Sequence, residues 1–331
     1  MKRLFILIFI ITPLIYSCSR SEEKKNCKID KITIYRLDKE MFEVDPYFIK
    51  DNTTKIINNC YLCLDIFSND IIKIGHIEDS LYFVLLQSFI SNYNNYQLYK
   101  RVIKLYDDIS MIEEELTNAF CSIKSLLSNI EMPKVYAYVS GFNQKVYVKE
   151  NTIGIGLENY LGRNEKLYDE YGFYNYLKTN MHRKKILPDI IYNYAKYLFP
   201  YNDSINNLIT NIIYEGMIMY FVKRILPYYN DTLIFGFTSS ELDFCKKNEK
   251  NMWTYLIENK LLFNNNPTII GRFIKEGPYT QDFGRNSPAK AVVWIGYKII
   301  NNYAKKNNIN LVNLMYERNY LKILNESKYN P

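Results

Sequence analysis

Residues 203–221, which read DSINNLITNIIYEGMIMYF, decide the fold. Their apolar side chains recur with the period of one helical face, and Asp203 or Ser204 stands where a helix cap is expected. The apolar stripe is wide and polar positions are few, which predicts a central, mostly buried helix. The stripe consists of Ile205, Leu208, Ile209, Ile212, Ile213, Met217 and Tyr220.

One ionisable side chain, Glu215, falls in the apolar half of this helix. A buried carboxylate is unfavourable unless it is paired or hydrogen-bonded. Its neighbourhood, residues 214–218, has the glutamate of H-E-x-x-H, a helical motif in which two histidines hold zinc and the glutamate activates water. Tyr214 and Ile218 occupy the histidine positions, so the zinc ligands are lost. Glu215 is therefore either the remnant of a catalytic site or a structural carboxylate bonded to a backbone group or a tyrosine hydroxyl.

Composition limits the classes of function. The chain has 331 residues, 48% of them hydrophobic, which is enough for one large domain with a substantial core. The formal net charge of +7 is mild, and no dense Lys/Arg patch with interleaved aromatic residues is present. Nucleic-acid binding is therefore not expected.

The first residues have the features of a targeting segment. Lys2 and Arg3 precede an apolar run, residues 4–14, that is too short to span a bilayer comfortably. The run ends in Ser17-Cys18, which is typical of a bacterial lipobox. We expect residues 1–17 to be a lipoprotein signal peptide, Cys18 to carry the lipid, residues 18–30 to form a tether and residues 31–331 to form the domain. The alternative is a plain signal peptide with an incidental cysteine.

Five further cysteines follow Cys18, an odd number, so at least one stays free or pairs between chains. Cys60 and Cys63 form a C-x-x-C pattern. A redox role would need a thioredoxin-like βαβ context, and a metal site would need a second Cys/His pair; neither is present. A local structural disulfide or two plain thiols is the favoured interpretation, and the sequence leaves these two open.

The rest of the pattern predicts a single, mainly helical α+β domain with a small antiparallel β meander. A first strand is expected at 31–37, and the meander at 135–139, 146–148 and 153–157, where Gly154 and Gly156 suggest close backbone approach. The region before residue 95 looks rich in loops. Helices are expected at 81–90, twice within 96–130, at 188–199, from the capping boxes at Ser110 and Thr238, from Ser287-Pro288 to 305, and at 311–324.

In this order, the pieces resemble the gliding-motility lipoprotein GldB family of Bacteroidetes. The resemblance implies a layout similar to zincin-like putative peptidases, in which a sheet precedes the H-E-x-x-H helix, here with the zinc motif lost. It also implies a role in the gliding machinery and the linked type IX secretion system. The residues that carry it are 35–38 with Phe42, 133–135, 156–162, 188–189, Trp253 with 258–262, 271–273, 287–288, 294–296 and 327–329.

These observations favour a non-enzymatic envelope lipoprotein, anchored on the periplasmic side of the inner or outer membrane and working with protein partners. No catalytic residue, metal or cofactor is expected. One alternative is a peptide-binding lipoprotein that uses the vestigial peptidase cleft, with residues 153–157 as an edge strand that pairs with a peptide. The other is an atypical metallopeptidase, which would have to gather His76 and His182 from unrelated loops.

Overall fold

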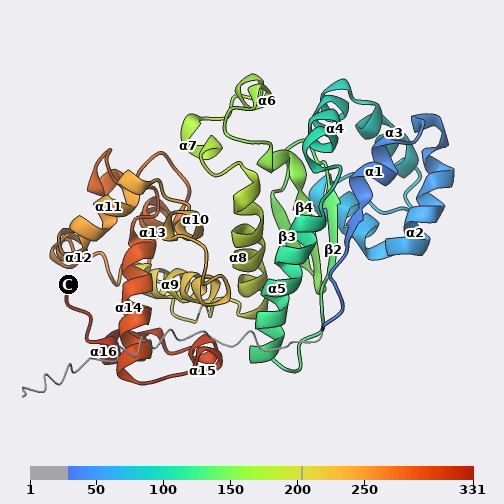
Figure 1. Cartoon of the computed structure of the whole chain (residues 1–331). Coiled ribbons are helices and arrows are strands. Elements are labelled where there is room, and N and C mark those ends of the chain that lie inside the picture. Colours follow the sequence, from blue (N-terminus) through green and yellow to red (C-terminus); the bar gives the residue numbers. More distant parts are fainter. Residues whose placement is uncertain (1–28, 203) are drawn as a thin grey trace, which may run out of the picture.

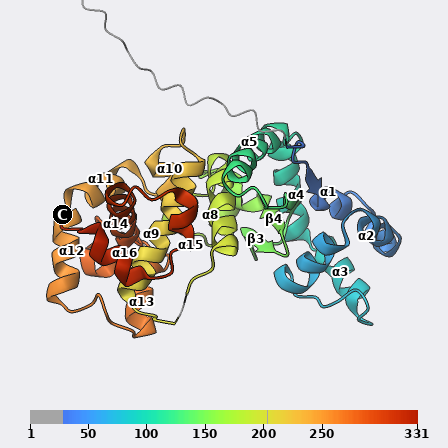
Figure 2. The same ribbon diagram turned by 90° about the horizontal axis from the view of Figure 1, so that it is seen from below.

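The computed structural model describes residues 29–202 and 204–331, and it confirms a mainly helical α+β fold. A small sheet lies between two groups of helices, as Figure 1 and the perpendicular view in Figure 2 show. The expected signal peptide and Cys18 lie outside the described residues. Within the described part, no helix combines the length and apolar character needed to cross a bilayer.

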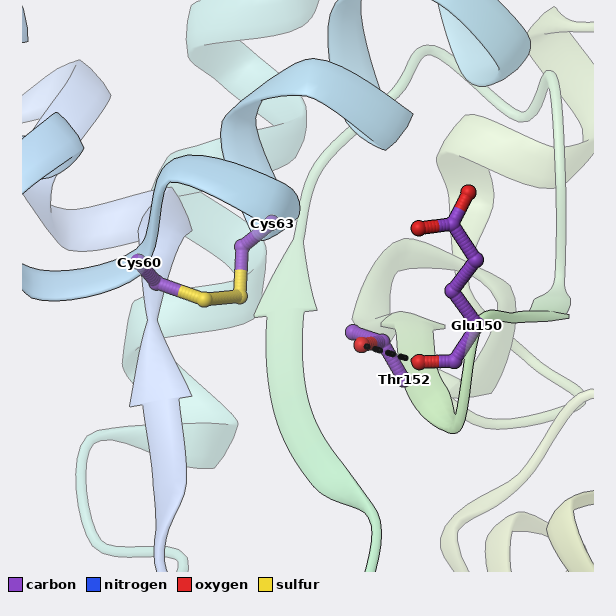
Figure 3. Close-up of a disulfide and its surroundings, with 4 residues drawn as sticks. All are labelled: Cys60, Cys63, Glu150 and Thr152. Carbon is purple, nitrogen blue, oxygen red and sulfur yellow. Dashed lines mark hydrogen bonds between the residues drawn. A yellow bond between two sulfur atoms is a disulfide. The ribbon is translucent and has the colours of Figure 1, made fainter.

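The described strands form one mixed sheet in the order β1-β2-β4-β3. β1 pairs with β2 and β2 pairs with β4 in parallel, whereas β3 and β4 form an antiparallel hairpin. In the turn of this hairpin the Thr152 hydroxyl donates to the Glu150 carbonyl at 3.4 Å (Figure 3). The strands are β1 (Ile34–Arg36), β2 (Lys134–Tyr138), β3 (Val146–Lys149) and β4 (Thr152–Gly156).

The predicted meander is therefore wrong in its pairing, and 153–157 is a central strand rather than an edge. All five residues of β4 are buried, whereas β3 keeps three half-exposed residues, as suits a strand at the edge. A Cβ at Gly154 would lie 2.7 Å from the rings of Tyr136 and Tyr138. Because glycine has no side chain, β4 can pair with β2 while the two tyrosine rings pack over Gly154. This confirms the close approach expected at this position.

The N-terminal helices cover one side of the sheet (Figure 1), and α2 (Ile49–Ile66) replaces much of the loop expected before residue 95. α2 bends at Cys60, whose φ of −157° and ψ of 77° are not helical. At this bend Cys60 is joined to Cys63 by a disulfide (Figure 3), one of the two outcomes left open by the sequence. These helices are α1 (Leu37–Phe42), η1 (Pro46–Phe48), α2 (Ile49–Ile66), η2 (Phe67–Ile71), α3 (Tyr82–Ser91) and α4 (Tyr93–Tyr106). The next helix, α5 (Ser110–Leu126), instead contacts α8 (Ile186–Leu198) and α9 (Leu208–Ile225).

The C-terminal helices gather beyond α8, which packs on β3 and on α9 (Figure 2). The connections after β4 are η3 (Leu157–Tyr160), α6 (Lys166–Glu170), α7 (Asn175–Lys178) and η4 (Arg183–Lys185). The helices that follow are α8 (Ile186–Leu198), α9 (Leu208–Ile225), α10 (Asp231–Phe235), α11 (Ser239–Lys247), α12 (Glu249–Glu258), α13 (Pro267–Ile274), η5 (Gln281–Phe283), α14 (Val292–Lys306), α15 (Leu311–Tyr316) and α16 (Tyr320–Ser327).

The predicted central helix exists as α9, and its most extensive helical contact is with α14. Thirteen of its residues are buried, including Ile212, Ile213 and Met217. The two helices touch backbone to backbone, since a Cβ at Gly216 would lie only 2.1 Å from the carbonyl carbon of Gly296. This contact fixes the position of the neighbouring Glu215.

Several predicted helix starts need correction. α9 begins at Leu208 with Asn207 as its cap, because the Asn207 side chain and Thr210 form a reciprocal capping box. α14 begins at Val292, since the Ser287 hydroxyl instead donates to the carbonyls of Thr280 and Gly284. The capping box at Thr238 is confirmed. The capping box predicted at Ser110 is wrong, because the Glu113 carboxylate accepts a hydrogen bond from the backbone N–H of Ile34 instead.

Candidate functional site

Glu215 lies where α9 faces α8. Its carboxylate accepts hydrogen bonds from the Tyr192 hydroxyl at 2.6 Å and from the Lys196 ammonium at 2.8 Å. Both donors belong to α8, one helical turn apart, and the Glu215 side chain is only 14% exposed. Burial and the Glu215 charge raise the pKa of Tyr192, which therefore stays protonated and donates. The carboxylate predicted from the sequence is thus paired with a cation and a tyrosine hydroxyl.

The two positions that hold zinc in H-E-x-x-H have other roles here. Tyr214 is buried and its hydroxyl donates to the Phe199 carbonyl at 3.1 Å. Ile218 is fully buried in the core. Both side chains therefore hold α9 in place and present no ligand to the space beside Glu215.

The histidines are not brought to Glu215. His76 is in the loop before α3, beside Asn69 and Asp65. His182 forms an isolated bridge with Leu161, and burial together with Lys185 and Lys145 lowers its pKa. In residues 29–202 and 204–331, no three His, Cys, Asp or Glu side chains form a group that could hold a metal ion.

A cavity of about 270 Å³ borders Glu215. Part of its wall is apolar, formed by Met219 of α9, Phe235 at the end of α10, Phe237 just after it, and Val293 of α14. The lining also carries charged side chains, among them Lys145 just before β3, Lys185 of η4 and Asp189 of α8. A concave apolar wall with a few convergent polar groups is typical of a small-ligand site.

The charged part of the cavity is built around Asp189, in the first turn of α8. Its Oδ2 accepts from Lys145 Nζ at 2.6 Å and from the Tyr160 hydroxyl at 3.1 Å, and its Oδ1 lies 3.2 Å from Lys185 Nζ. Burial alone would raise the pKa of Asp189, but the two ammonium groups outweigh burial and lower it. Burial in turn lowers the pKa of Lys185, whose side chain is 8% exposed. We call Lys145, Lys185 and Asp189 the lysine cluster.

A second buried carboxylate, Glu158, holds the loop that ends in Lys145. Its Oε1 accepts from the Ser140 N–H at 2.8 Å, the Ser140 hydroxyl at 2.7 Å and the Phe142 N–H at 3.2 Å. Its Oε2 is buried without a hydrogen-bond partner among the described residues. Burial raises the pKa of Glu158 to about 7, against the opposing effect of these bonds. Glu158 therefore helps to set where Lys145 enters the cavity.

Sequence reasoning found Glu215 and missed the lysine cluster. Its members come from three separate segments, and nothing in their spacing reveals that they meet. One signal was present, because Pro188-Asp189 is among the residues that carry the family resemblance. The helix predicted at 188–199 accounts for the proline and gives no reason to expect Asp189 in a cavity.

The model of one protein family, described as "Gliding motility protein GldB", matches residues 18–331. The chain belongs to the GldB family. Membership suggests a lipoprotein related to gliding motility, and the match begins at Cys18, the residue expected to carry the lipid. No curated protein and no solved structure matches the chain.

Proposed function

We propose that this GldB-family protein is a non-enzymatic lipoprotein of the cell envelope that acts by binding, as an accessory part of the gliding or type IX secretion machinery. Membership in the family supports the motility context. The lipid on Cys18 would keep the domain at the membrane, on the periplasmic side of the inner or outer membrane. The function therefore requires protein partners in the envelope and no cofactor.

The observation that carries the non-enzymatic part is the state of Glu215. In a zinc peptidase this carboxylate takes a proton from a metal-bound water. Here it is within 2.8 Å of the Lys196 ammonium and 2.6 Å of the Tyr192 hydroxyl. Each of its two oxygens is therefore already bonded to a donor of α8, as expected of a structural carboxylate. This pairing favours a structural role and speaks against the atypical metallopeptidase.

The test is complementation of a deletion strain, scored by gliding and by export of a secreted cargo, with the abundance of each variant measured in parallel. We expect Glu215→Gln to support both activities in proportion to its abundance. Glu258→Gln, a change of the same kind on the exposed face of α12, is the matched control. Full abundance of Glu215→Gln with complete loss of export would contradict the structural role. Normal gliding and export in the deletion strain would remove the assignment altogether.

The cavity favours a second candidate, a peptide-binding lipoprotein that uses the vestigial cleft. Strand addition along 153–157 does not support it, because β4 lies between β2 and β3 and has no free edge. The cavity beside Glu215 supports it instead, since it combines an apolar wall with the lysine cluster. The two candidates are compatible if the bound peptide belongs to a partner or cargo.

A further inference from the structure

We propose that the cavity beside Glu215 binds the free carboxylate of an apolar ligand, with the lysine cluster as the carboxylate site. This inference rests on the proposed function, because it names the chemistry that a binding protein of this shape would recognise. The ligand is either the carboxy-terminal residue of a peptide or a small apolar acid, which share this chemistry.

The first argument is the number of hydrogen-bond donors. Lys185 Nζ donates to the Leu233 carbonyl at 2.9 Å and lies 3.2 Å from Asp189 Oδ1. Lys145 Nζ lies 2.6 Å from Asp189 Oδ2 and 3.4 Å from the Asn180 carbonyl. Each ammonium group has three N–H donors. One N–H on each lysine therefore has no hydrogen-bond acceptor among the described residues, although Lys145 Nζ also lies 4.9 Å from the centre of the Tyr160 ring. These two N–H groups are the donors that the proposal assigns to a ligand carboxylate, with Asp189 left in place.

The second argument is charge. Two ammonium groups face the single carboxylate of Asp189, so the lysine cluster carries one excess positive charge, with the Lys185 side chain 8% and the Lys145 side chain 35% exposed. The other acidic groups on the wall are bonded to partners outside the lysine cluster. Glu215 is paired with Lys196, Glu276 with Lys290, and the Glu241 carboxylate accepts the Thr238 N–H at 2.7 Å in the cap of α11. The excess positive charge of the cluster favours a ligand of opposite sign.

The third argument is the shape of the remaining space. Met219, Phe235, Phe237 and Val293 form an apolar wall in the same cavity as the two lysines. Its volume of about 270 Å³ is at the lower limit for ligand pockets, which run from roughly 300 to 1,000 Å³. It therefore suits one terminal residue or a small acid better than an extended segment. An apolar side chain on the wall and a carboxylate on the lysines satisfy both parts of the cavity.

The test measures binding of ligands that differ only in the end group. The purified mature chain is titrated calorimetrically with N-acetylated tripeptides ending in Leu, Ile, Val, Met or Phe, each as the free acid and as the amide. 3-Phenylpropionate serves as the small acid. We expect at least one free acid to bind and its amide to bind at least tenfold more weakly. Tighter binding of the peptide acids identifies a peptide terminus as the source of the carboxylate, and tighter binding of 3-phenylpropionate identifies a free acid.

Variants separate the site from general effects of charge. Lys145→Gln should weaken binding of the acid at least tenfold and leave binding of the amide unchanged. Lys298→Gln is the matched control, because its side chain is also 35% exposed and pairs with Glu249 away from the cavity. Equal affinity for acid and amide, no binding of any probe, or equal effects of the two variants would overturn the proposal. Complementation by wild type under those results would leave the accessory function standing, so the two failures are distinguishable.

Discussion

Alanine at Gly216 tests whether the close crossing of α9 and α14 determines stability. The new Cβ would lie 2.1 Å from the Gly296 carbonyl carbon and 2.4 Å from its oxygen, where ordinary contact begins near 3.4 Å. Both atoms belong to a helix backbone and cannot rotate away, so the helices have to separate by roughly 1 Å. Overpacking of this kind destabilises a core by about 1–3 kcal/mol.

A gain opposes this loss, because alanine is favoured over glycine in a helix interior by about 1 kcal/mol. With overpacking at the upper end of its range, Gly216→Ala should lower the free energy of unfolding by about 2 kcal/mol. Gly271→Ala in α13 is the matched control, since its Cβ would meet only the flexible Lys275 side chain at 3.4 Å. That variant should gain up to about 1 kcal/mol.

The assay is urea unfolding of the purified chain, followed by the fluorescence of Trp253 and Trp294. The same chemical change should thus give results of opposite sign at the two glycines, with a difference of about 3 kcal/mol. Met219 of α9 and Val293 of α14 both line the cavity, so Gly216→Ala should also weaken ligand binding. A Gly216→Ala protein as stable as Gly271→Ala would refute the crossing as described.

Three other predictions concern single residues. The pKa of Glu158 is about 7 when folded and about 4.5 when unfolded, so the folded chain holds this proton more tightly. Stability should therefore fall as pH rises from about 4.5 to 7, by up to about 3 kcal/mol, and Glu158→Gln should remove this fall when unfolding is compared at pH 5 and 8. Thr238→Ala should lower the urea midpoint by an amount equivalent to about 1 kcal/mol, because it removes the cap of α11; an unchanged midpoint would count against the capping box. Metabolic labelling with a fatty acid should disappear in Cys18→Ala, and labelling that persists would exclude Cys18 as the lipid site.

Local patterns in the sequence predicted the elements well where those patterns decide the structure. The apolar period of Ile212, Ile213 and Met217 located α9, and the capping box at Thr238 located the start of α11. The predicted start of α9 was wrong because several neighbouring polar residues, Asp203 and Ser204 among them, are also able to cap a helix. The structure selects Asn207, whose side chain pairs with Thr210.

Features that depend on distant segments were not predictable in this way. The pairing of β2 with β4 rather than β3 depends on how glycine in β4 fits against Tyr136 and Tyr138, and alternation along a strand does not encode it. Gly216 and Gly296 are in contact although eighty positions separate them in the sequence. The residues around either glycine give no indication of which segment it contacts. The lysine cluster was missed for the same reason, since its residues meet only when η4, α8 and the hairpin pack together.

The bend in α2 has a consequence for the order in which the protein matures. Cys60 and Cys63 are three positions apart, so their sulfurs can meet before any of the sheet has formed. Such a disulfide persists in an oxidising compartment, whereas the thiol-reducing systems of the cytosol keep both cysteines reduced. The direction of the second half of α2 can therefore be set during export, while β2 and β4 are still unpaired. A chain produced in the cytosol lacks the disulfide and has to form the same bend by packing alone. The conformation of α2 therefore depends on the compartment in which the chain folds.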